Sequence, residues 1–264
     1  RFGDAIVDHR TYVLAGDGDL MEGISHEAIS LAGHLQLSKL IVLYDSNSIS
    51  IDGATDLALS DNAMQRFQAS GWDAFDADGH DPAAIAQALE AAVESAKPAL
   101  IVCRTRIGFG APTKEGSEAS HGAPLGAEEI AGTRERLGWP HPPFVVPAEI
   151  LALWREAGVQ RAQAHADWQH RLAASDATLR AEFERMSHGD LPDDWSAGLV
   201  EFKRALATDQ PKIASRVAGQ KTLEVLFQAL PELVGGSADL SGSNGTRVAG
   251  MVAIAPGDFS GSYV

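Results

Sequence analysis

The pattern that most constrains the fold is an alternation of short apolar runs with segments of helical periodicity. The apolar runs lie at Thr11–Ala15, Leu40–Tyr44 and Ala99–Arg104, and a further strand is expected at Gly71–Asp76. Apolar residues recur at helical spacing over Glu22–Leu37, and a second helix is predicted over Pro82–Ala96, with Asp81 as its cap. Strands that are apolar along their whole length are typical of parallel sheets. The sequence therefore predicts an α/β fold, in which helices cover both faces of a parallel sheet.

The second half of the chain has a mostly helical and polar pattern. It extends over Ala127–Met186, and helical periodicity returns at Gly219–Leu230 after a linker-like stretch at Asp190–Trp195. A short apolar segment followed by Gly235–Asp239 is similar to a strand that ends in a loop. Between the two halves, Gly108–Gly126 is a long loop rich in Gly, Ser and Pro, and loops of this length are often functional.

Composition argues against several classes of protein. The 264 residues carry a formal net charge of −15, and the lysines and arginines are scattered, so neither nucleic acid nor an anionic membrane is expected as a partner. A negatively charged ligand must then be held by a metal ion or by a few placed cations. Cys103 is the only cysteine, which excludes a disulfide framework and fits a reduced intracellular setting. No apolar run approaches the roughly 20 residues of a membrane span.

Asp17 and Asn47 are candidate ligands of a divalent metal. Each follows a predicted strand, so both should lie at the edge of the sheet where parallel strands end and where such folds bind ligands. Asp17 offers an anionic oxygen, Asn47 an amide oxygen, and the turn through Ile49 a backbone carbonyl. Gly16 and Gly18 leave the backbone free to turn sharply and approach a phosphate. Two diphosphate oxygens and a water would complete the octahedron that Mg²⁺ prefers.

Gly-Asp-Gly alone is common in turns, but the sequence around it is specific. The run GDGDLMEGISHEAISLAGHLQLSKLIVLYDSNSISIDG resembles the thiamine-diphosphate motif of transketolases. Four later motifs agree in order: IGFG at Ile107–Gly110, SHGAPLG at Ser120–Gly126, FVVP at Phe144–Pro147 and LPELVGGSADLSGSN at Leu230–Asn244. HGAPLG and GGSADL point to transketolases rather than to 2-oxo-acid dehydrogenases or deoxyxylulose-phosphate synthase. One departure is Asp-Ser-Asn, where many thiamine enzymes have Asn-Asn.

The resemblance implies roles for individual residues around the cofactor. Asp17, Asn47 and the carbonyl of Ile49 match the metal ligands, and Gly18 and Asn47 match contacts to the diphosphate. His121 matches an active-site histidine that lies near both the diphosphate and the substrate, so it is expected to act in catalysis and in binding. Without the resemblance, it would be an ordinary histidine of a loop.

Further residues match positions more distant in the sequence. Arg216 and Ser243 match the pair that grips the sugar phosphate, and an arginine fork with a hydroxyl suits a phosphate. Glu22 and Glu27 match acidic residues at the dimer interface that link the two active sites, and Glu22 is counted as catalytic on this ground. Asp239 matches an aspartate near the cofactor.

The resemblance implies a transketolase that depends on thiamine diphosphate and on Mg²⁺, or on Ca²⁺ or Mn²⁺ in its place. The reaction would move a two-carbon ketol group reversibly from a ketose phosphate to an aldose phosphate. Phosphorylated sugars are therefore the expected partners, together with a second copy of the chain in a homodimer. A cytoplasmic location and a role in the pentose phosphate pathway or in carbon fixation are also implied.

The resemblance also implies a division of the chain into domains. Residues 1–188 match the diphosphate-binding domain with a helical C-terminal extension, and residues 189–264 match a linker and the start of a similar pyrimidine-binding domain. Members of the family need a glutamate in a Gly-(Ile/Val)-Arg-Glu-His segment, which this sequence lacks, as it lacks histidines that precede Gly-Asp-Gly in the family. We therefore expect an internal portion of a longer enzyme, inactive by itself.

Two alternatives to a transketolase stay open at this stage. A dihydroxyacetone synthase is a close relative that carries the same motifs. The chain would instead be a non-catalytic module for cofactor binding or dimerisation if the short chain were the natural product. The full gene distinguishes the enzyme from the non-catalytic module: an Arg-Glu-His codon run downstream would support the enzyme, and an in-frame stop after Val264 would support the module.

Overall fold

The computed structural model describes residues 1–264, and the chain forms two compact units. One unit comprises His9–Gln160, and the other comprises Arg1–Asp8 with Arg161–Val264. The predicted division into residues 1–188 and 189–264 follows the domains of the family and differs from these packing units, and it stays a prediction. None of the helices combines the length and the apolar character needed to cross a membrane.

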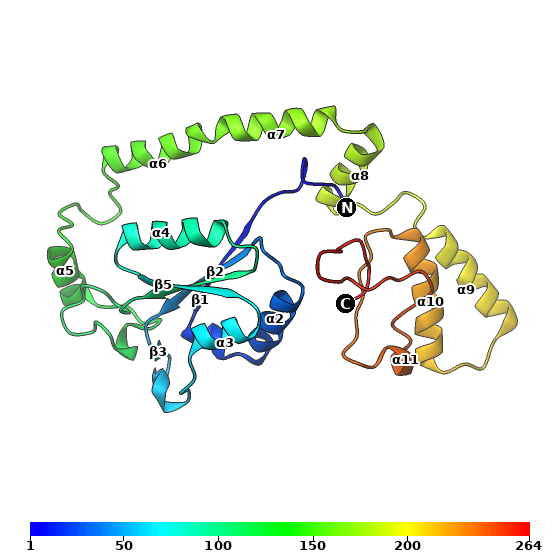
Figure 1. Cartoon of the computed structure of the whole chain (residues 1–264), viewed down its shortest axis with the longest axis horizontal. Coiled ribbons are helices and arrows are strands. Elements are labelled where there is room, and N and C mark those ends of the chain that lie inside the picture. Colours follow the sequence, from blue (N-terminus) through cyan, green and yellow to red (C-terminus); the bar gives the residue numbers. More distant parts are fainter. The chain divides into compact units, whose positions relative to one another are not determined.

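The unit His9–Gln160 is built on a four-stranded parallel sheet (Figure 1). In spatial order the strands are β1 (Thr11–Gly16), β2 (Leu40–Ser46), β6 (Ala99–Arg104) and β5 (Asp73–Asp78). All four predicted strands are confirmed, and each neighbouring pair is parallel. The register pairs Gly16, the last residue of β1, with Asp45 near the end of β2. The carboxyl ends of these two strands therefore meet at one edge of the sheet.

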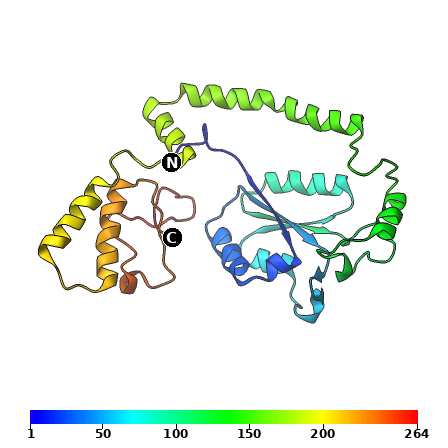
Figure 2. The same cartoon turned by 180° about the vertical axis from the view of Figure 1, so that it is seen from behind.

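Helices cover both faces of the sheet, as Figures 1 and 2 show. α2 (Gly23–His34) and α3 (Ala63–Ala69) pack on one face, and α4 (Pro82–Val93) packs on the other. Neighbouring residues of β6 alternate between two cores: Leu100 joins the core under α2 and α3, and Ile101 joins the core under α4. Because the central strands β2 and β6 are buried on both faces, they are apolar at successive positions, and the predicted α/β fold is confirmed.

The helix predicted over Glu22–Leu37 is confirmed as α2, and a short helix that the pattern does not predict precedes it. A short helix, α1 (Asp17–Met21), directly follows β1, and Glu22 separates it from α2 with an extended backbone of φ −64° and ψ 139°. α4 begins where predicted, because Asp81 accepts the amide of Ala83 at 2.9 Å and Pro82 occupies the first turn.

α2 packs closely against the turn that follows α3, and this contact requires a glycine. A Cβ atom at Gly33 would lie 1.7 Å from the carbonyl oxygen of Ser70. On the same side, the indole of Trp72 donates a hydrogen bond to the carbonyl of Ile29 at 2.9 Å. These contacts fix α2, and with it the α1–α2 segment, against the sheet.

The rest of this unit consists of a hairpin and of helices. β3 (Ile49–Ser50) and β4 (Gly53–Ala54) pair antiparallel directly after β2, and a 3₁₀ turn follows at Thr55–Leu57. After the long loop come α5 (Ala127–Arg136) and α6 (Ala148–Gln160), in agreement with the predicted helical pattern.

The second unit is helical, and it includes the first residues of the chain. Its helices are α7 (Ala162–Ala174), α8 (Ala177–His188), α9 (Ala197–Asp209), α10 (Ser215–Ala229) and α11 (Ser241–Asn244). The indole of Trp168 donates to the carbonyl of Ile6 at 2.8 Å, and Phe2 packs edge-on against Phe183. The periodicity of the sequence predicts α10 but not α9, which has no side-chain cap at Ser196 and packs against α10.

The predicted strand before the Gly235–Asp239 loop is wrong. Gly235 makes one isolated bridge to Tyr263, in which its amide donates to Ser262 at 3.0 Å and its carbonyl accepts from Val264 at 2.9 Å. A stable strand needs several consecutive residues paired with a neighbouring strand, whereas Gly235 pairs with residues 262–264 at a single bridge.

Candidate functional site

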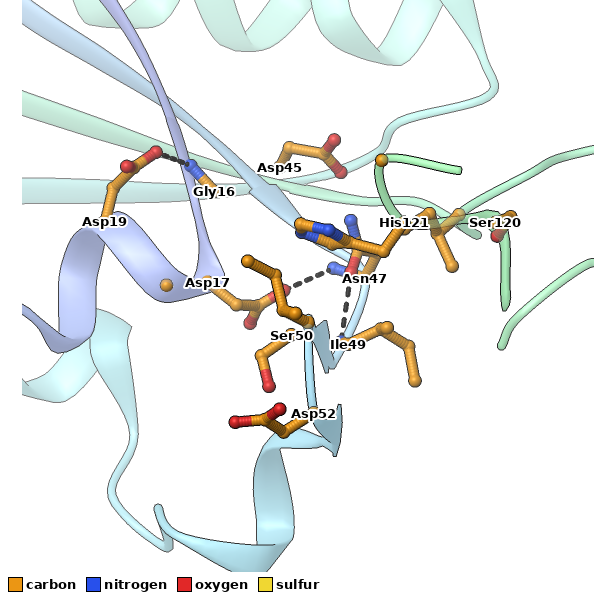
Figure 3. Close-up of a pocket in the computed structure, with 14 residues that line it drawn as sticks. Gly16, Asp17, Asp19, Asp45, Asn47, Ile49, Ser50, Asp52, Ser120 and His121 are labelled. Atoms are coloured by element: carbon orange, nitrogen blue, oxygen red, sulfur yellow. Dashed lines mark hydrogen bonds between the residues drawn. The ribbon is translucent and has the colours of Figure 1, made fainter. Parts of the chain in front are cut away.

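A cavity of about 630 Å³ opens at the carboxyl ends of β1 and β2 (Figure 3). Its wall is formed by the β1–α1 junction, the β2–β3 turn, the β3–β4 hairpin and the loop between β6 and α5. The lining residues are Gly16, Asp17, Gly18, Asp19, Asp45, Asn47, Ile49, Ser50, Ile51, Asp52, Ile107, Ser120, His121 and Gly122. The structure thus brings together all the predicted metal and cofactor residues: Asp17, Gly18, Asn47, Ile49 and His121.

Asp17 is the buried polar residue of this wall, with 6% of its surface exposed. Its Oδ2 accepts the backbone amides of Asn47 at 3.0 Å and of Ser48 at 2.9 Å, and its Oδ1 accepts the hydroxyl of Tyr44 at 2.5 Å. An ionised carboxylate offers about four lone-pair positions, and these bonds occupy both positions of Oδ2 and one of Oδ1. One lone pair on Oδ1 therefore stays available for a ligand.

Tyr44 holds Asp17 from inside the core. Its ring packs in the core between the sheet and α2, together with Leu20 and Phe67. Burial and the hydrogen bond to Asp17 raise the pKa of Tyr44 to about 12. The phenol therefore stays protonated near neutral pH and continues to donate to the carboxylate.

The turn after β2 presents Asn47 and the backbone of Ile49 to the cavity. The Oδ1 of Asn47 accepts the amide of Ile49 at 3.0 Å, which leaves a second lone pair on the amide oxygen. Ser48 adopts a left-handed φ of 63°, and its carbonyl accepts the amide of Thr55 at 3.0 Å. The turn is thus fixed from both sides by hydrogen bonds.

The cavity wall is acidic. It carries the carboxylates of Asp17, Asp19, Asp45 and Asp52, and no lysine or arginine. A bare anion would be repelled there, whereas an anion that arrives with a divalent cation would not. No group of three or more His, Cys, Asp or Glu side chains converges to hold a metal ion. A metal at this site would therefore have one carboxylate and neutral protein oxygens as ligands, and the anion would have to supply further oxygens.

His121 reaches the cavity on the loop between β6 and α5. It follows the 3₁₀ turn Glu118–Ser120, and its amide donates to the carbonyl of Glu118 at 2.9 Å. Gly122 comes next with a φ of 72°, a left-handed conformation that favours glycine. His121 therefore lines the same cavity as Asn47, although 74 positions separate them in the sequence.

The start of this loop is anchored by His80. The Nε2 of His80 accepts the amide of Arg106 at 3.0 Å, and its ring stacks on Phe109 with the centroids 4.0 Å apart. Ile107, between these two contacts, is part of the cavity wall. His80 thus fixes one side of the cavity without lining it.

The remaining predicted residues do not line the cavity. Glu22 is exposed at the junction of α1 and α2, and Glu27 is exposed on α2. Arg216 lies in the first turn of α10 and Ser243 lies in α11, two helices of the second unit that pack together. Asp239 precedes α11 with a φ of 60°. The roles of these residues stay predictions.

Sequence reasoning assigned no role to Tyr44 or His80. Tyr44 belongs to the apolar run LIVLY, whose pattern indicates only a buried strand. A hydroxyl near the end of a buried strand, next to a predicted metal site, is the signal by which it could have been found. His80 carries no comparable signal.

Together, the fold and this cavity define a class of protein: a parallel α/β domain with an acidic crevice at the carboxyl ends of its strands, where such folds bind ligands. The profile of the family described as "Transketolase, thiamine diphosphate binding domain" matches residues 1–192. The chain belongs to this transketolase family, and the expected resemblance is confirmed.

Curated relatives and solved structures agree with this assignment. Transketolases of Cereibacter sphaeroides and Sinorhizobium medicae are 52% and 53% identical to it; each alignment covers 100% of this chain, but 40% and 38% of those proteins. The structure of a transketolase from Leishmania mexicana matches with a TM-score of 0.86 and 39% identity, over 98% of this chain and 39% of that one. A Pichia stipitis transketolase mutant in complex with fructose-6-phosphate matches with a TM-score of 0.85 and 37% identity, over 96% and 39%. The chain thus spans about two fifths of the relatives that it matches.

Proposed function

We propose that this chain is the diphosphate-binding part of a transketolase, which passes a two-carbon ketol group reversibly from a ketose phosphate to an aldose phosphate. The observation that carries the proposal is the acidic cavity, where one buried carboxylate stands beside neutral oxygen donors at the ends of β1 and β2. Such a wall accepts an anionic cofactor only together with a metal ion. The family match supports thiamine diphosphate as that cofactor.

The residues of the wall fit a metal and a diphosphate. Asp17 has one free lone pair on Oδ1, Asn47 has one on its amide oxygen, and Ile49 adds its carbonyl; we assign these as the ligands of Mg²⁺, or of Ca²⁺ or Mn²⁺. A Cβ at Gly18 would meet no atom within 4 Å, so the backbone there is open to a diphosphate. We assign Gly18 and Asn47 as its contacts.

Bound thiamine diphosphate supplies the electron sink for cleavage of the carbon–carbon bond. The share of this chain is to hold the diphosphate, to keep water out and to orient the sugars. His121 would donate a hydrogen bond to the diphosphate or to a sugar hydroxyl at the cavity. Arg216 and Ser243 would hold the sugar phosphate, by a guanidinium fork and by a hydroxyl.

Several features of the whole enzyme belong to the proposal. Structures of Pichia stipitis transketolase in complex with fructose-6-phosphate and with sedoheptulose-7-phosphate support ketose phosphates as substrates. We further propose a cytoplasmic homodimer of the pentose phosphate pathway, with Glu22 and Glu27 at the dimer interface and Asp239 near the cofactor. The functional domains would comprise residues 1–188 and 189–264.

Turnover by the full-length gene product tests this function. We expect ketol transfer between a ketose phosphate and an aldose phosphate, and we expect it to require both thiamine diphosphate and a divalent metal. Transfer of the ketol group to added formaldehyde, which yields free dihydroxyacetone, in preference to an aldose phosphate would indicate the dihydroxyacetone synthase instead. Cofactor binding without any transfer would indicate a non-catalytic module, and absence of metal-dependent cofactor binding would refute the assignment of the cavity.

A further inference from the structure

We infer that Tyr44 is a positioning residue, which orients the carboxylate of Asp17 for the metal. The inference rests on the proposed metal and diphosphate site and adds a residue to it. Tyr44 does not line the cavity, so it acts on a bound metal only through Asp17. The role is inferred from the hydrogen bond between Tyr44 and Asp17, not from a sequence motif or a charge pattern.

The placement of Tyr44 follows from the register of the sheet. Tyr44 pairs with Ala15, two residues before Asp17, and only 7% of its surface is exposed. Its ring packs in the core with Phe67 of α3 and Ile29 of α2, and it also borders a second cavity, of about 490 Å³, that Asp17 lines as well. A ring packed in this way has little freedom to move, so its hydroxyl, 2.5 Å from Oδ1 of Asp17, is a fixed point for the carboxylate.

The division of hydrogen bonds between the two oxygens of Asp17 shows what Tyr44 adds. The amides of Asn47 and Ser48 both bind Oδ2, so by themselves they hold the carboxylate at one oxygen and allow it to rotate about that oxygen. The hydroxyl of Tyr44 occupies one lone pair of Oδ1 and thereby sets the direction of the other. That remaining lone pair is the one that would face a metal.

This arrangement predicts a different effect on two metals. Mg²⁺ requires near-ideal octahedral geometry with ligands at about 2.0–2.1 Å, whereas Ca²⁺ accepts irregular geometry at about 2.3–2.6 Å. A carboxylate that is held only through Oδ2, and can therefore rotate further, should harm binding of Mg²⁺ more than binding of Ca²⁺. A general loss of folded protein would not distinguish the two metals, because it lowers the apparent affinities for Mg²⁺ and for Ca²⁺ by the same factor.

The test is Tyr44→Phe in the full-length enzyme, since this change removes the hydroxyl and keeps the ring. Mg²⁺ and Ca²⁺ are titrated calorimetrically at saturating thiamine diphosphate, and urea unfolding of the metal-free protein is measured in parallel. We expect the affinity for Mg²⁺ to fall about 10- to 100-fold, which is usual for a lost partner of a metal ligand, and the affinity for Ca²⁺ to fall by a smaller factor. Tyr12→Phe is the matched control, because Tyr12 lies on β1 with 53% of its surface exposed, and it should change neither affinity.

The outcomes separate the inference from the function on which it rests. An unchanged or tighter affinity for Mg²⁺ in Tyr44→Phe overturns the inference. So does an equal loss for both metals, because a purely structural role produces that result. A wild-type enzyme that binds no metal in the presence of thiamine diphosphate contradicts the proposed function itself, and the inference falls with it.

Discussion

The carboxylate of Asp17 accepts the backbone amide of Ser48 at 2.9 Å, across 31 positions of sequence. With the neighbouring bond from the amide of Asn47, it ties the carboxyl end of β1 to the turn after β2. The side chain proposed as the anionic metal ligand is therefore also the residue that builds the turn from which the other ligands come. Its removal should affect both the chemistry and the shape of the site.

Asp17→Ala should abolish metal-dependent binding of thiamine diphosphate, because it removes the only carboxylate among the proposed ligands. It should also destabilise the fold by about 1–3 kcal/mol, since the amides of Asn47 and Ser48 lose their acceptor. Calorimetry with and without Mg²⁺ measures the first effect, and urea unfolding measures the second. Asp52→Asn, on the same cavity wall, is the control and should retain metal-dependent binding. Unchanged cofactor affinity in Asp17→Ala would remove Asp17 from the site.

Gly33→Ala should destabilise the protein although glycine is a poor helix former. The added Cβ would lie 1.7 Å from the carbonyl oxygen of Ser70, so α2 or the turn after α3 must move. We expect a loss of about 2 kcal/mol or more in the free energy of unfolding, measured in urea. Gly23→Ala, at the start of the same helix, meets no atom within 4 Å and should be neutral or slightly stabilising. Equal effects of the two changes would contradict the close contact.

Arg216→Ala in the full-length enzyme should raise the KM for phosphorylated sugars and leave the affinity for thiamine diphosphate unchanged. The reason is that the proposed role of Arg216 concerns the phosphate of the sugar, not the cofactor. Lys221→Ala removes an exposed cation from the same helix, α10, and serves as the control. Steady-state kinetics decides: a KM that stays at the wild-type value would exclude Arg216 from the substrate site.

The ion pair between Arg185 and Glu232 should make the free energy of unfolding depend on pH in the acidic range. The guanidinium donates to both carboxylate oxygens, at 2.9 and 3.1 Å, and holds the pKa of Glu232 below its ordinary value of 4.5. Because the pKa is lowered in the folded state, the pair stabilises the fold above the ordinary pKa. This contribution disappears as the pH falls through the lowered value.

Glu232→Gln should therefore lower the urea midpoint at pH 7 and have progressively less effect in acid. The effect should also shrink in high salt, since both side chains are partly exposed. Glu224→Gln, an exposed glutamate of α10, is the control. A difference between Glu232→Gln and wild type that persisted undiminished at low pH would show that the ion pair is not its cause.

The strands and the proposed ligands could be predicted from sequence because each is a local signal. β2 and β6 are buried on both faces, so they are apolar at successive positions. Asp17 directly follows β1, and Asn47 directly follows β2. Adjacent parallel strands end at the same edge of the sheet, so Asp17 and Asn47 can be predicted to lie close together even when no side-chain contact is known.

The contacts that support the site are not local, and the sequence analysis missed them for this reason. Tyr44 meets Asp17 across 27 positions, and His80 meets Arg106 across 26. α9 lacks a cap and depends on packing against α10, so its boundaries carry no strong signal. For the strand expected before Gly235, the local apolar signal is present but the pairing partner is not. An apolar segment that pairs with one short neighbour does not form a strand.

His80 holds the cavity through two separable contacts. His80→Phe keeps an aromatic ring beside Phe109 and removes the acceptor for the amide of Arg106, whereas His80→Ala removes both. We expect the affinity for thiamine diphosphate to fall in both variants, and to fall further in His80→Ala, because the loop that carries Ile107 is then held by neither contact. His34→Ala, at the end of α2, is the control histidine and should bind as the wild type does. Calorimetry gives the affinities, and limited proteolysis of residues 106–126 reports the loop directly. If cleavage and affinity both stay at wild-type values in His80→Ala, the loop is anchored by other contacts.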